Sequence, residues 1–98
     1  MSASAAAAAL IQHDADIAAQ VVRFDRTDDE NRYRLSRRDE GVAILESALG
    51  TWTLALAAAA ANVSELQVLT AMAYQLNLGT LPVCRGIAAR LVADEVVT

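Results

Sequence analysis

The feature that most constrains this chain is an uncharged, alanine-rich stretch from Ser47 to Val63, which contains the single tryptophan. Read as a helix from Trp52, this stretch carries apolar residues in every direction. One apolar stripe consists of Trp52, Leu56, Ala59 and Val63. Leu54 points to the other side. A helix that is apolar all round lies either in the core of a protein or in a membrane.

The membrane alternative fits this stretch poorly. A spanning helix needs about 20 predominantly apolar residues, whereas this run is shorter and is interrupted by Thr51, Thr53 and Asn62. The chain also lacks a basic amphipathic face for binding to a membrane surface. We therefore expect no membrane partner and place the stretch in a protein core, with Trp52 as a buried anchor.

Composition predicts the fold class. The 98 residues are enough for a single domain, 1–98, that buries a modest core without metal or disulfide support. Four glycines and one proline leave little turn chemistry, and abundant alanine favours helix. We predict an all-α fold, a small four- or five-helix bundle built around the central Ala-rich apolar helix.

The first helices are predicted from caps and apolar spacing. Ser2 or Ser4 can cap a first helix that continues to Phe24. A corner follows at 25–28, and a second helix runs from Asp28 to Leu49. The apolar rhythm continues across Gly50 and Thr51, which favours an unbroken helix there over a true break. Two charges fall on apolar faces, Asp14 and Arg38, and we expect them to pair if these helices pack antiparallel.

Two further turns are predicted downstream. The apolar stripe shifts near 62–64, where Ser64 and Gln67 have the spacing of a capping box, so we expect a bend or a helix restart. The run 77–80 contains Asn77 and Gly79 and predicts the last turn. The final helix then has an inner face of Val83, Ile87, Ala88 and Leu91.

Catalytic and ligand-binding patterns are sparse. His13 and Asp16 share a helix face, but a zinc site needs further His or Cys ligands that the sequence does not supply. No phosphate-binding loop is present, and Cys84 is predicted to pack as a small apolar residue. We expect neither enzymatic activity nor a metal or other cofactor. A single cysteine fits a reducing compartment, and we predict a cytoplasmic protein.

Helix packing is the predicted mode of action. Small alanine faces let helices approach closely, and a bundle this small with few aromatics tends to leave apolar surface uncovered. We predict an assembly subunit, adaptor or chaperone-like partner that binds itself, as a homo-oligomer, or another helical protein. A self-contained monomeric bundle would show the same stripes. The candidate contact residues are Arg32, Arg34, Arg37, Arg38, Trp52 and Leu56. The arginines belong to a charged run that is either a solvated corner or a docking face for an acidic partner.

DNA binding is the alternative function. Residues 66–92 resemble the spacing of a generic helix-turn-helix, in which Ala73 lets two helices cross, Asn77 makes the turn, and Val83 and Ile87 hold the second helix down. The net charge of −4 and the near-neutral supposed reading helix count against this alternative.

Overall fold

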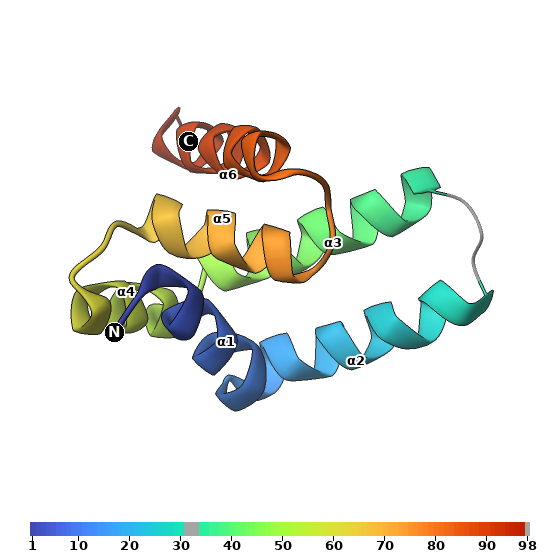
Figure 1. The fold of residues 1–98 in the computed structure, drawn as a ribbon, viewed down its shortest axis with the longest axis horizontal. Coiled ribbons are helices and arrows are strands. Elements are labelled where there is room, and N and C mark those ends of the chain that lie inside the picture. Colours follow the sequence, from blue (N-terminus) through green and yellow to red (C-terminus); the bar gives the residue numbers. More distant parts are fainter. Residues whose placement is uncertain (31–33, 98) are drawn as a thin grey trace.

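The computed structural model describes the backbone of residues 1–30 and 34–97, and the side chains of residues 1–26 and 37–95. Every regular element in these ranges is an α-helix, which confirms the all-α prediction (Figure 1). The helices are α1 (Ala3–His13), α2 (Ala15–Glu30), α3 (Arg34–Leu49), α4 (Trp52–Ala61), α5 (Glu65–Gln75) and α6 (Leu81–Val97).

Six helices are described, more than the four or five predicted, because the chain breaks at two points where continuity was expected. Asp14 has an extended backbone and separates α1 from α2. Gly50 and Thr51 separate α3 from α4, whose axes meet at 79°. A continuous apolar rhythm therefore did not keep the helix unbroken, since Thr51 takes an extended backbone there as the N-cap residue of α4.

The corner between the second and third helices lies later than predicted. Helix α2 runs through residues 25–28 and ends at Glu30, and α3 begins at Arg34 instead of Asp28. Residues 27–30 read Thr-Asp-Asp-Glu, a pattern typical of a helix start, and they lie inside α2. Residues of this kind favour a cap without forcing one, and no glycine or proline stands there to end the helix.

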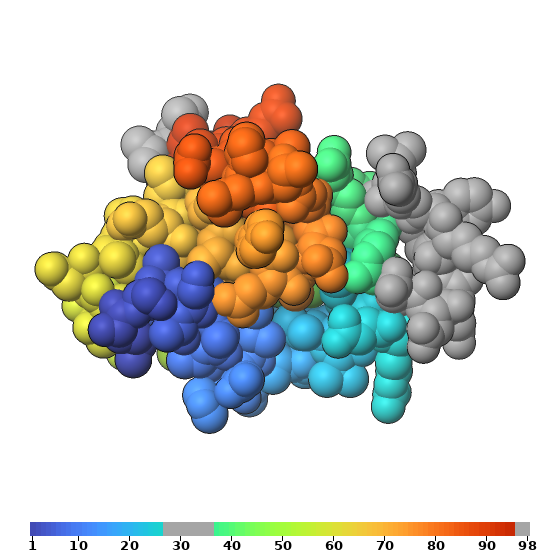
Figure 2. Space-filling model, viewed as in Figure 1, coloured from blue at the N-terminus to red at the C-terminus, as the bar shows by residue number. Residues whose placement is uncertain are grey.

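The centre of the molecule is α5, and the prediction of a central Ala-rich helix is not confirmed. Helix α5 packs against α1, α3, α4 and α6, and Figure 1 shows it between them. Its buried side chains include Val68, Leu69 and Met72, which remove more apolar area from water than alanines do. The Ala-rich helix α4 instead forms one edge of the molecule, visible at the yellow side of Figure 2.

Several boundary predictions are confirmed. The hydroxyl of Ser2 accepts a hydrogen bond from the Ala5 amide and caps α1. Asn62 has φ 55°, a left-handed conformation that ends α4. Ser64 and Gln67 form a capping box at the start of α5. Asn77, with φ 61°, lies in the predicted turn before α6.

In the part of the chain that the structure describes, no helix alone has the length and apolar character to cross a membrane. The segments Arg37–Leu49 and Trp52–Ala61 meet those criteria only when taken together, and they are sharply bent relative to each other.

Candidate interaction surface

Helix α4 exposes an apolar surface that we call the α4 face, defined by four residues. They are Trp52, Leu56, Ala59 and Ala60. Trp52 is 78% exposed and Leu56 is 53% exposed. At 100° per residue these four positions occupy one side of the helix, whereas Leu54, Ala58 and Ala61 are buried on the other.

The expected burial of Trp52 is therefore wrong, and so is the inward direction of its stripe. The helix is rotated so that Leu54, fully buried, enters the core while Trp52 faces outward. Because both sides of this helix are apolar, the sequence pattern does not predict which side is buried. This outcome matches the alternative in which Trp52 is available to a partner.

A hydrogen-bond network accompanies this rotation at the start of α4. The hydroxyl of Thr53 donates to the carboxylate of Asp14 at 2.5 Å, and the hydroxyl of Thr51 donates to the carbonyl of Ala48 at 2.8 Å. The same Asp14 carboxylate accepts from the amides of Asp16 and Ile17, each at 3.1 Å, and so caps α2. Turning Trp52 inward would pull Thr53 away from Asp14.

The network acts on the protonation of Asp14. The hydrogen bond from Thr53 lowers the pKa of this carboxyl below its ordinary value, and those from the Ile17 and Asp16 amides act in the same direction. The carboxylate therefore stays charged, which is the form that accepts all three hydrogen bonds. Sequence reasoning noted Asp14 as misplaced on an apolar face but missed its role as a cap; an Asp three residues before Ile17 was the available signal.

The expected pair between Asp14 and Arg38 is wrong for the same reason. Asp14 is occupied at the junction of α1, α2 and α4, while Arg38 is exposed and its guanidinium lies 3.4 Å from the carbonyl oxygen of Leu78. Arg38 thus contacts the turn between α5 and α6, and its partner is a backbone carbonyl instead of Asp14.

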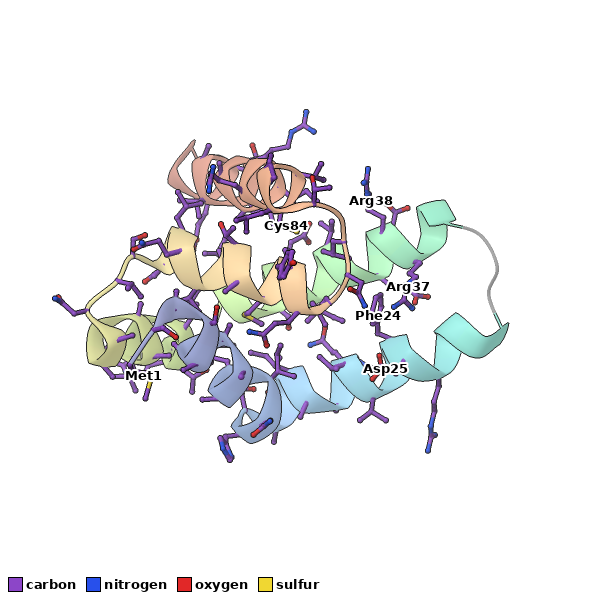
Figure 3. The ribbon with its side chains drawn as sticks, in the orientation of Figure 1. Met1, Phe24, Asp25, Arg37, Arg38 and Cys84 are labelled. Atoms are coloured by element: carbon purple, nitrogen blue, oxygen red, sulfur yellow. The ribbon has the colours of Figure 1, made fainter. Side chains whose placement is uncertain are left out.

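The structure does not bring the predicted arginines together with the α4 face. Figure 3 places Arg37 and Arg38 toward the end of the molecule opposite α4. The Arg37 guanidinium lies over the ring of Phe24, 4.1 Å from its centroid, and links α3 to α2. Arg32 and the side chain of Arg34 lie outside the described residues.

The segment that resembles a helix-turn-helix keeps some of its expected features. Ala73 is fully buried and Asn77 takes the left-handed turn conformation, as predicted. The inner face of α6 differs from the expected one, because Cys84 is buried beside Ala88 while Val83 is 40% exposed. Gly79, at φ 155°, leaves room for the Val83 side chain, because a Cβ added there would lie 2.8 Å from Cγ1 of Val83.

Cys84 is the only cysteine of the chain, and its thiol lies away from the protein surface. Cys84 is fully buried and its thiol lies 3.5 Å from the carbonyl oxygen of Gly79. Burial raises the pKa of the Cys84 thiol, with Arg38 opposing the effect. Within the described residues, no three His, Cys, Asp or Glu side chains gather in a way that could hold a metal ion.

A shallow groove of about 300 Å³ lies between α2 and α3. Its walls are mixed in character: Gln20, Arg23, Phe24, Glu40, Ala43 and Ile44. The amide of Gln20 donates to the hydroxyl of Ser47 at 2.6 Å and joins the two helices beneath it. The groove is open, and so it has the character of a helix-pair surface more than of an enclosed ligand pocket.

Comparison of the chain with protein-family models, with curated proteins and with solved structures gives no match. Assignment of a role therefore rests on the fold and on the surfaces described above. Among these surfaces the α4 face is distinguished by large exposed apolar side chains on a helix without charge.

Proposed function

We propose that this chain is a non-enzymatic helical interaction protein, an assembly subunit or adaptor that acts by packing the α4 face against a helix of another molecule. The partner is a second copy of the chain or another helical protein. The observation that carries the proposal is the exposure of Trp52 and Leu56 side by side on one face. Aromatic side chains are among the residues that contribute most to protein interfaces when they become buried.

The local chemistry favours an apolar helical partner over a membrane surface or a charged ligand. From Ser47 to Ser64 the chain carries no ionisable side chain, and the residues flanking this run are Glu46 and Glu65. Asp14 adds a third acidic group through its bond to Thr53. Anionic lipids would be repelled by these carboxylates, and an apolar helix meets no unpaired charge on this face.

The arginines of α3 are the second part of the proposal, as a contact for an acidic partner segment. Arg38 is exposed and supports this role, whereas Arg37 is half-buried over Phe24. We now expect Arg37→Ala to weaken the fold as well as any complex, so Arg38→Ala is the better probe. An acidic partner should bind more weakly to the Arg38→Ala variant, with the melting temperature lowered only slightly, since the fold loses one long hydrogen bond to Leu78.

In-cell photo-crosslinking tests the main proposal. A photoreactive phenylalanine analogue is placed at Leu56 or, as a control, at Val22. The two positions are matched, because they are 53% and 52% exposed and lie on different helices. We expect protein adducts from position 56 and few from position 22. If position 56 gives no more adducts than position 22, the α4 face is ordinary surface and the proposal is wrong.

DNA binding remains the second candidate, supported by the buried Ala73 and the left-handed Asn77 between α5 and α6. Arg85 and Arg90 on α6 are exposed, as is Arg38 on α3, although Asp94 and Glu95 follow on α6. Retention on double-stranded DNA that falls steeply with salt, and that weakens on Arg85→Ala, would support it. Absence of retention at low salt would remove it.

A reducing, cytoplasmic location is part of the proposal. It is supported by a lone cysteine that is buried and by a fold that uses no disulfide among its described residues.

A further inference from the structure

We propose that the partner of the α4 face is a second copy of this chain, packed antiparallel across a two-fold axis near Leu56. This inference rests on the proposed function and names its partner. It follows from three properties of the face, which are its gradient of side-chain size, its lack of charge and its area.

Side-chain size falls along the exposed side of α4. Trp52 stands at the N-terminal end, Leu56 in the middle, and Ala59 and Ala60 at the C-terminal end, all of them exposed. In a two-fold interface the same patch meets itself, so that residue i contacts residue j and j contacts i. An antiparallel pair centred on Leu56 places the indole of each copy over the two alanines of the other.

A parallel pair would fit this gradient badly. The two Trp52 rings would meet at one end and hold the helices apart, which would leave the alanines at the other end facing a gap. Close packing without voids is what an interface core requires. The antiparallel pair fills the hollow above Ala59 and Ala60 with the largest side chain of the face, and so the gradient selects this direction.

Charge favours this face over the others for self-association. The chain has a net charge of −4, so two copies repel each other in general. The α4 face lies within the uncharged run from Ser47 to Ser64, and a second copy docking there buries no ionisable side chain. Glu46 and Glu65, which flank the run, are exposed at its ends, so their mutual repulsion weakens the dimer and is screened by salt. A charged partner segment would gain no ion pair from the same face.

The area of the face sets the strength of the dimer. With 78% of its surface exposed, Trp52 offers about 150–200 Å², and Leu56 with the alanines brings the face to about 400–500 Å² per copy. Two copies then bury at most about 800–1,000 Å² in total, which is below the roughly 1,200–2,000 Å² of stable interfaces and in the range of weak, transient ones. A face of this size belongs with weak, transient interfaces, so we expect a reversible dimer that forms only within the range of about 10–500 µM.

The test uses sedimentation velocity and tryptophan fluorescence of the full chain from about 5 to 500 µM. Because the chain has one tryptophan, its emission reports on Trp52 alone. We expect the sedimentation coefficient to rise and the emission to shift to shorter wavelength over the same concentration range. Leu56→Glu should abolish both changes, because two carboxylates would meet at the axis. Val22→Glu, at a position of equal exposure on α2, should leave both changes intact.

Charge reversal tests the axis itself. Leu56→Glu and Leu56→Lys should each be monomeric, and an equal mixture of the two should recover the dimer as a heterodimer. Recovery on mixing also shows that neither variant is misfolded. If the mixture stays monomeric while the wild-type chain dimerises, the two-fold position at Leu56 is wrong.

The outcomes separate this inference from the proposed function. A wild-type chain that remains monomeric, with unshifted Trp52 emission at about 500 µM, overturns the self-docking inference. If position 56 nevertheless crosslinks to a different protein in cells, the interaction function stands and its partner is another helical protein. If neither self-association nor any adduct is found, both proposals fail.

Discussion

Trp52→Ala and Leu54→Ala form a matched pair on α4 that tests the rotation of this helix. The structure exposes 78% of Trp52 and none of Leu54. The covered fifth of the indole is about 50 Å², which stabilises the fold by about 1 kcal/mol, and the higher helix propensity of alanine offsets about 0.5 kcal/mol of that loss. We therefore expect Trp52→Ala to cost about 0.5 kcal/mol.

Leu54→Ala should behave in the opposite way, because it removes a side chain from the core. Truncation of a fully buried leucine costs about 2–5 kcal/mol, from lost burial and from the cavity that remains. For a domain of this size 1 kcal/mol corresponds to about 4–8 °C in melting temperature. The Leu54 variant should therefore melt at least about 10 °C lower than the wild type, and the Trp52 variant only a few degrees lower.

Thermal and urea unfolding followed by far-UV circular dichroism measures both free energies. The protein should be kept at about 5 µM, below the concentrations at which we expect the dimer, so that association does not add to the stability of the wild type. An equal loss of stability in the two variants would mean that Trp52 packs in the core. The account of the α4 face, and both proposals built on it, would then be refuted.

Three other substitutions test the packing elsewhere. Asp14→Ala should cost about 0.5–2 kcal/mol of stability by removing the α2 cap and the contact with Thr53. Because the pKa of Asp14 is lowered in the folded protein, this stabilisation is present above the unfolded pKa and is lost as pH falls through the folded pKa. The stabilities of wild type and variant, measured by urea unfolding, should therefore converge at acid pH. Gly86→Ala should stabilise α6 by up to about 1 kcal/mol, seen as a higher melting temperature, because nothing lies within 4 Å of the added Cβ. Gly41→Ala should lower the melting temperature instead, since the added Cβ would meet Leu78 and overpacking of this kind costs about 1–3 kcal/mol. A rise in melting temperature equal to that of Gly86→Ala would contradict the packing of α3 against Leu78 in the turn between α5 and α6.

Some of this fold follows from the sequence because the determining interactions are local. The helix caps at Ser2 and Ser64 and the left-handed turn at Asn77 involve residues within a few positions of one another, and the structure has all three. Alanine content and scarce turn residues likewise predicted an all-helical chain. Propensity and capping act over one or two turns, and a single sequence displays them directly.

The remainder depended on contacts between distant parts of the chain. Asp14 and Thr53 are far apart in sequence, and their hydrogen bond ties the start of α4 to the junction of α1 and α2. Two apolar sides on one helix are equivalent until neighbouring helices α1, α3 and α5 occupy one of them. The sequence by itself determined that α4 would be helical, uncharged and apolar all round. Only the tertiary structure decided that Leu54 is buried and Trp52 exposed, because burial is a property of what packs against a side chain and not of the side chain alone.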